Sequence, residues 1–287
     1  MVGQGAQSEV SLPQYNDEHG QVKSLVRSPR TSWLSGTFVL GPIDPRHTDL
    51  LLLAHSLATG IIDAATFANY AVFAGMQTGN TVLLGLSAAT TPSNPHAWLT
   101  TLVSITSYLL GALLTFRLTS LVLPSGLASN RLYLSLLLFL QAALVLLPAA
   151  LIAADLIPHN PPGMVPSITA AHVLENVHIV AVIPPLAFQA GMQIATSRLL
   201  GFNELPVNVL TSTYCDIMGD KHVLKRDNEK RNRRVASVVL LLAGAVGAGW
   251  IMRSRAGTEG ALFVAAAIKA GAAVAGFVFL GRGEKAS

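Results

Sequence analysis

Two ionisable residues lie within long apolar stretches of this 287-residue sequence: Asp63 in the segment GIIDAATFANY and Lys269 in AAAIKAGAA. On insertion scales, an Asp or Lys at the centre of a membrane helix costs about 2.5–3.5 kcal/mol, so such residues usually have a partner or a function. Asp63 could hold a proton or a cation, act as a counter-ion, or accept bonds from freed backbone groups. Lys269 could pair with Asp63 or face an aqueous cavity. Both are therefore candidates for binding an ion or a substrate.

Further polar residues gather where the apolar stretches are interrupted, near Gly75 and Gly79 and again, more weakly, after Gly191. Asn and Thr side chains can accept hydrogen bonds from the backbone N–H groups that the start of a helix leaves unpaired. These residues therefore either cap half-helices or help a helix N-terminus to bind an anionic group. The candidates are Asn69, Gln77, Thr78, Asn80, Gln193, Asn208 and Thr211. His55, early in the first apolar stretch, is interpreted as a packing residue.

The composition is that of a membrane protein. Hydrophobic residues make up 51% of the chain, charged residues 12%, and the mean hydropathy is +0.51, whereas soluble domains carry about 25% charged residues. A helix needs about 20 apolar residues to cross a bilayer. The sequence therefore predicts an all-α membrane protein with six main transmembrane helices, at 49–72, 98–121, 132–154, 178–201, 235–252 and 260–281. Shorter uncharged stretches follow the first and fourth of them, 77–90 and 207–219, and predict broken or re-entrant segments.

Basic residues indicate the orientation of these helices. The 221–234 segment contains seven Lys and Arg residues, whereas 88–97 and 155–171 contain none. Since positive residues favour the cytosolic side, six crossings place this segment and both termini in the cytosol; Arg253 and Arg255 are exceptions. The polar segment 1–47 predicts a disordered tail, and 48–282 predicts the transmembrane domain.

The two parts of this domain, 48–154 and 171–282, share a weak repeat. Gly60-x-x-x-Ala64 recurs as Gly191-x-x-x-Ala195, and Thr78 to Thr81 has a counterpart in Thr211 to Thr213. With three helices in each half, the second half begins from the opposite side, so the repeat is inverted. Inverted repeats with helices broken at corresponding positions are typical of secondary transporters. Close helix packing or a simple kink is the alternative explanation for the glycines.

The segments GIIDA, QTGNTVLLGL, GMQIATSR and VLTSTYCDIMGD resemble signatures of the YoaK-like family of uncharacterised transmembrane proteins. The resemblance extends over about residues 48–282. Two positions depart from the pattern, where Ile194 and Ser212 stand in place of the usual Asn and Gly. The resemblance implies a multi-pass membrane protein, and no substrate or site residue follows from it.

These observations favour secondary transport of a small solute, with proton coupling through Asp63 as one possibility. The alternative is a non-transporting scaffold or a lipid-interacting accessory protein. No catalytic motif, cofactor motif or metal-ligand spacing is recognisable, so we expect no enzymatic activity, no cofactor and no metal. The expected partners are the lipid bilayer and a small molecule; the basic residues lie beside apolar stretches, which does not favour nucleic acid.

Overall fold

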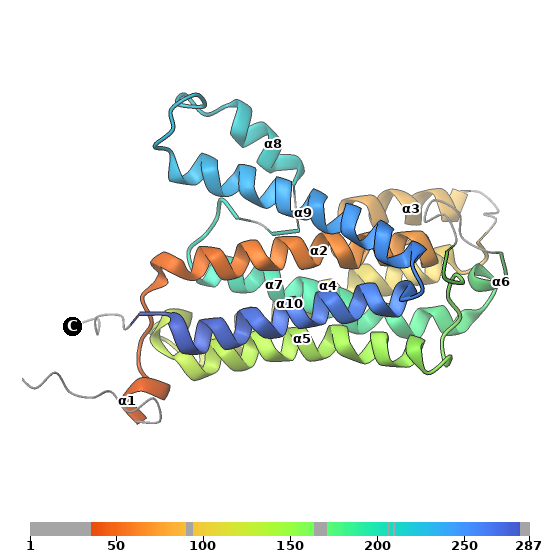
Figure 1. Ribbon diagram of the computed structural model, residues 1–287, viewed down its shortest axis with the longest axis horizontal. Helices are drawn as coiled ribbons and strands as arrows, with labels where there is room; N and C mark the ends of the chain where they lie inside the picture. Colours follow the sequence, from red (N-terminus) through yellow and green to blue (C-terminus); the bar gives the residue numbers. More distant parts are fainter. Residues whose placement is uncertain (1–35, 90–93, 164–170, 206, 209, 282–287) are drawn as a thin grey trace, which may run out of the picture.

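Six long helices dominate the computed structural model, which describes residues 36–89, 94–163, 171–205, 207–208 and 210–281. All six are long and apolar enough to cross a membrane, and the regular structure of the described residues is entirely helical (Figure 1). The fold class and the number of spans are confirmed. The helices are α2 (Thr48–Tyr70), α4 (Ala97–Val122), α5 (Arg131–Ala153), α7 (Ile183–Leu199, continuing the 3-10 helix η3, Val177–Val182), α9 (Glu229–Arg253) and α10 (Gly257–Phe279).

Shorter elements connect these helices. The predicted broken segments form α3 (Gln77–Ala89), which packs on α4, and α8 (Thr211–Met218), which projects from the bundle beside the start of α9 (Figure 1). The others are α1 (Gly36–Val39), η1 (Pro45–His47), η2 (Leu127–Ser129) and α6 (Ala171–Leu174).

The end of the predicted disordered tail is ordered. Residues 36–47 contain α1 and η1, and Ile43 between them is 2% exposed. Phe38 contacts the ring of Phe277 and lies under the Arg131 guanidinium, 4.3 Å from its ring centroid. The expectation of disorder over 1–47 is therefore wrong for 36–47, because apolar contacts anchor these residues; residues 1–35 lie outside the described part of the chain.

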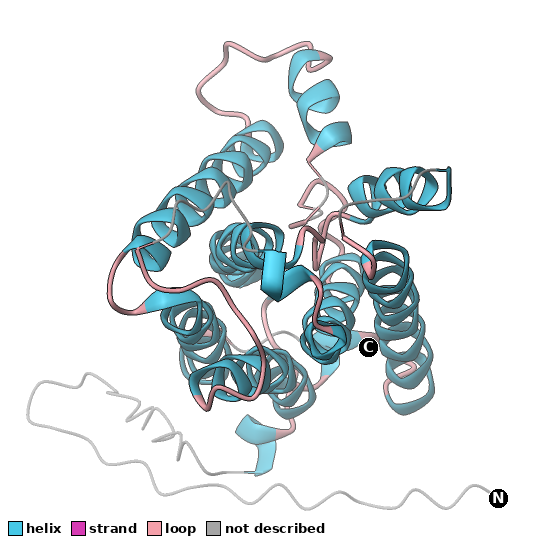
Figure 2. Cartoon of the chain, turned by 90° about the vertical axis from the view of Figure 1, so that its right-hand side faces the viewer, coloured by secondary structure: helices cyan, strands magenta, loops and turns pink. Residues whose placement is uncertain are grey.

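Glycines set the closest helix crossings. A Cβ added to Gly60 of α2 would lie 1.9 Å from the carbonyl oxygen of Leu241 in α9, and one on Gly244 of α9 would lie 2.1 Å from that of Leu57. Likewise, a Cβ added to Gly191 of α7 would lie 2.0 Å from the carbonyl oxygen of Tyr108 in α4, and one on Gly111 of α4 would lie 2.1 Å from that of Phe188 in α7. These contacts join α2 to α9 and α4 to α7, while α5 packs on α10. Figure 2 shows the long helices of the bundle from one end.

One end of the bundle gathers the starts of α2, α5 and α9 and the end of α10. The Asp44 N–H donates a 3.0 Å hydrogen bond to the carbonyl of Gly281, and Arg233 pairs with Asp49 at 2.9 Å. Arg131 is 1% exposed and donates to the last carbonyls of α10, which a helix leaves unpaired.

The basic 221–234 segment lies at this same end, because α9 begins at Glu229 and its first turns contain Arg233 and Arg234 (Figure 1). Arg253 and Arg255 lie at the opposite end, after α9 has crossed the bundle. Six crossings therefore bring the basic groups of the described residues to one end, apart from these two arginines and Lys269, which is buried within α10; Arg282 and Lys285 are not described.

We predict that the basic end faces the cytosol. Cys215 is exposed and would itself react, so it is first replaced by serine. In this Cys215→Ser background, the exposed position of Lys225→Cys should react with a membrane-impermeant maleimide only after cells are permeabilised, because basic segments stay inside. Arg255→Cys, at the opposite end, should react in intact cells. The reverse pattern would contradict this orientation.

We also predict that Gly60→Ala destabilises the protein by about 1–3 kcal/mol, as overpacking generally does, because its methyl group would overlap the α9 backbone. Thermal unfolding of the purified protein in detergent measures the effect. Gly249→Ala in α9 is the matched control, since nothing lies within 4 Å of its added Cβ. Equal stability of the two variants would refute the close crossing.

Candidate functional site

The first interruption follows α2. The helix ends at Tyr70, and Ala71 adopts a left-handed conformation with φ of 53°. The chain then folds back until the N–H of Gly75 donates a 2.7 Å hydrogen bond to Oδ1 of Asp63. The other carboxylate oxygen, Oδ2, is buried and has no hydrogen-bond partner among the described residues. Asp63 therefore holds the returning backbone with one oxygen and leaves the other available.

Asn80 and Gln77 satisfy the backbone at this interruption. Asn80 is fully buried; it accepts a 3.0 Å bond from the N–H of Phe73 and donates a 2.7 Å bond to the carbonyl of the same residue. Ser104 of α4 donates to that carbonyl at 2.8 Å, and Gln77 donates to the carbonyl of Ala74 at 2.8 Å. Unpaired backbone groups are costly in lipid, so these contacts favour the capping interpretation of Asn80 and Gln77.

The second interruption follows α7. Gly201 turns the chain with φ of 87°, and the segment then enters the bundle, where Leu205, Val207 and Asn208 are buried. The Asn208 side chain donates a 3.1 Å bond to the carbonyl of Ala190, near the middle of α7. Its Oδ1 is buried and finds no partner within the described part of the chain.

The two returning segments meet inside the bundle. A Cβ added to Gly75 would lie 3.0 Å from Oδ2 of Asp63 and 3.3 Å from Cβ of Asn208. We call Asp63, Gly75 and Asn208 the junction. It holds two buried oxygens, Oδ2 of Asp63 and Oδ1 of Asn208, for which the described residues supply no hydrogen-bond donor.

A second polar site surrounds Lys269, which is fully buried near the middle of α10. Its Nζ contacts Nδ1 of His55 at 3.1 Å, Oε1 of Gln141 at 3.4 Å and Oε1 of Gln193. Nε2 of Gln193 donates to the hydroxyl of Thr59 at 2.7 Å. We call these five side chains, from α2, α5, α7 and α10, the polar layer.

The polar layer separates two apolar clusters. On α10, Lys269 lies between Ala266 of one cluster and Ala272 of the other; on α2, His55 lies between Leu52 and Ala58 in the same way. The layer therefore crosses the middle of the bundle, where burial of polar groups requires hydrogen bonds.

Asp63 and Lys269 do not pair with each other. The ion pairs among the described residues include neither of them, because Asp63 bonds to the backbone of Gly75 and Lys269 to neutral side chains. The sequence could not reveal this difference, since both residues were expected in the same apolar interior.

Three candidates lie away from both sites. Asn69 is buried, accepts a 2.8 Å bond from the N–H of Asn160, and fastens a connecting loop to the end of α2. Thr78 and Thr211 are exposed on α3 and α8. The structure thus brings together Asp63 with Asn208, and Lys269 with Gln193, and the remaining candidates belong to neither pair.

The sequence analysis missed Gln141 and Thr59 and interpreted His55 as a packing residue. A signal was present, because each is a polar residue within a predicted span. Their importance depends on convergence toward Lys269, which the spacing along four separate helices does not reveal.

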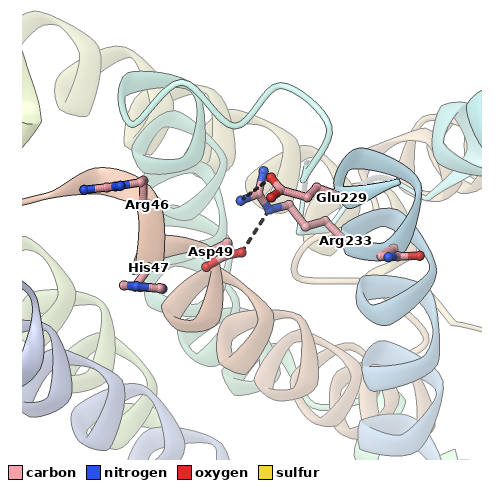
Figure 3. A pocket seen from close by; sticks show the side chains of 6 residues that line it. Arg46, His47, Asp49, Glu229 and Arg233 are labelled. Carbon is pink, nitrogen blue, oxygen red and sulfur yellow. Dashed lines mark hydrogen bonds and ion pairs between the residues drawn. The ribbon is translucent and has the colours of Figure 1, made fainter. Parts of the chain in front are cut away.

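A cavity of about 390 Å³ opens at the basic end, between the starts of α2 and α9 (Figure 3). Its charged groups already bond to one another: Arg233 pairs with Asp49 at 2.9 Å and with Glu229 at 3.6 Å. At its rim, Arg46 donates hydrogen bonds from its side chain and backbone to Asp44, which lowers the pKa of that carboxyl. The cavity is a polar vestibule with balanced charge.

A known protein family matches most of the sequence. Residues 51–275 match the profile of a family described as "Protein of unknown function (DUF1275)". The chain belongs to this family. No curated protein and no solved structure matches the chain. The match agrees with the expected membership of an uncharacterised family over most of the chain, while the YoaK-like name stays an interpretation.

We predict that Asn80→Leu lowers the free energy of unfolding by about 1–3 kcal/mol, the usual cost of leaving a buried polar group unsatisfied, because the N–H of Phe73 loses its partner and its carbonyl keeps only Ser104. Thr78→Ala, an exposed change in the same helix, is the control and should unfold like the unmodified protein. Thermal unfolding in detergent measures the stability of both variants. If Asn80→Leu is as stable as the unmodified protein, Asn80 does not stabilise the backbone at this interruption.

Proposed function

We propose that this multi-pass membrane protein is a secondary transporter of a small solute. The observation that carries the proposal is the junction, where two interrupted segments from different halves of the chain meet beside Asp63. In transporters, helices broken at corresponding positions form substrate and ion sites at the interface between repeats. The proposal assigns the protein no catalytic activity.

The arrangement of close crossings supports an inverted repeat. Exchanging the halves 48–154 and 171–282 converts the contact of α2 with α9 into that of α7 with α4. The glycines correspond under the same exchange, since Gly60 meets α9 near Gly244 and Gly191 meets α4 near Gly111. The interruptions correspond as well: each one folds back toward the middle of its preceding helix, at Asp63 and at Ala190.

Asp63 is the candidate coupling group. Its Oδ2 is buried and unpartnered among the described residues, so it can take up a proton without breaking the 2.7 Å bond from Gly75 to Oδ1. A proton there also supplies a donor beside Oδ1 of Asn208, a second oxygen that has no partner among the described residues. Because Asp63 lies where the two returning segments meet, taking up a proton there can change the contact between the segments.

Transport in proteoliposomes tests the proposal. We expect the unmodified protein to take up at least one class from a panel of amino acids, sugars, organic acids and nucleobases, at a rate that depends on an imposed pH gradient. Asp63→Asn keeps an acceptor for the N–H of Gly75 and should remain folded, but its uptake should lose the dependence on the gradient.

Asp155→Asn, at an exposed turn between the two halves, is the matched control and should transport normally. A folded Asp63→Asn with unchanged gradient-dependent uptake would refute proton coupling through this residue. Absence of uptake by the unmodified protein across the panel would favour a non-transporting scaffold, in which the same contacts only brace the bundle.

A further inference from the structure

Protonated Lys269 is a cation in the polar layer for which the described residues supply no counter-charge. Lys269 is fully buried, and the ion pairs formed by the described residues do not include it. Its three contacts, with His55, Gln141 and Gln193, are to a ring nitrogen and two amide oxygens. These neutral groups satisfy its hydrogen bonds but do not balance its charge, which is costly at the centre of a membrane protein.

His55 adds an unused donor beside this charge. An ammonium group has only donors, so Nδ1 of His55 accepts the bond from Lys269. The proton of the neutral ring then lies on Nε2, because a neutral imidazole carries one N–H and one acceptor nitrogen. Nε2 is buried and has no partner among the described residues. A positive charge and a free N–H donor therefore lie on adjacent side chains.

The orientation of the two glutamines is fixed by partners on both sides of each amide. A carboxamide has both an acceptor oxygen and a donor NH₂ group. In the structure, Gln141 and Gln193 direct their oxygens to Lys269 and their amide nitrogens to Thr196 and Thr59. The hydroxyls of Thr59 and Thr196 donate to the carbonyls of His55 and Met192. Each hydroxyl therefore only accepts from its glutamine, and both amide oxygens stay directed at Lys269.

From this chemistry we infer that the polar layer binds a small monovalent anion, such as a halide, nitrate or a short carboxylate. The anion accepts a bond from Nε2 of His55 and balances the charge of Lys269, which lies on the other side of the same imidazole ring. That this anion is also the carried solute rests on the proposed transport function; binding itself does not.

Anion-dependent thermal stability of the purified full chain tests the inference. Chloride, nitrate, formate and acetate are each compared with gluconate, a larger anion, at equal ionic strength in a cationic buffer. We expect at least one small anion to raise the unfolding temperature of the unmodified protein saturably. Lys269→Met should weaken this apparent affinity about ten- to a hundredfold, because the opposite charge across the imidazole ring is lost in a low-dielectric interior.

Two further variants make the result specific. Lys230→Met removes an exposed lysine and should leave the response unchanged. His55→Phe keeps the cation but removes Nε2, so it should also weaken the response, and it serves as the test if Lys269→Met does not fold. A response that is absent, or that is identical in all variants, overturns the inference.

Binding and transport can fail separately. Uptake of a neutral or cationic solute without any anion response would refute the anion site and keep the transport proposal. A saturable, Lys269-dependent anion response without uptake of any solute would keep the site and refute transport.

Discussion

The structure depends on one constraint: backbone groups freed within a membrane must find partners in the protein, because lipid offers none. Two segments leave the helical pattern inside this bundle, and each is held by polar side chains. Asp63 accepts a hydrogen bond from the N–H of Gly75, and Asn80 bonds to both backbone groups of Phe73. Asn208 donates to the carbonyl of Ala190. These side chains satisfy the backbone groups of the interrupted segments and fix where those segments lie.

Close helix contact makes this bracing possible. Without a strong hydrophobic force between helices in lipid, association depends on tight packing at small residues. Gly60 with Gly244, and Gly191 with Gly111, let two helix pairs approach until their backbones touch. The pairs join α2 to α9 and α7 to α4, so neither half of the chain packs by itself. The junction and the polar layer both lie where side chains from the two halves converge.

The interior keeps its carboxylate and its ammonium apart. Asp63 lies at the junction with one oxygen unpartnered within the described residues, and Lys269 lies in a layer of neutral side chains. A direct pair would satisfy both charges and leave a rigid, neutral core. Separation leaves each group dependent on what else can bind beside it, which is why the proposed proton site and the proposed anion site are distinct.

The sequence by itself determined the class of the protein and its spans, since apolar length is a local property; all six predicted regions agree with the helices to within a few residues, except that α9 begins earlier, at Glu229. It also singled out Asp63, Asn208, Gln193 and Lys269 as unusual, because a polar residue in an apolar stretch is visible without a structure. Their partners were decided only by the tertiary structure. Lys269 meets His55 across 214 positions of sequence, and Gly75 meets Asn208 through two chain reversals. Such contacts depend on how glycines let the helices cross, and that geometry is a property of the whole bundle.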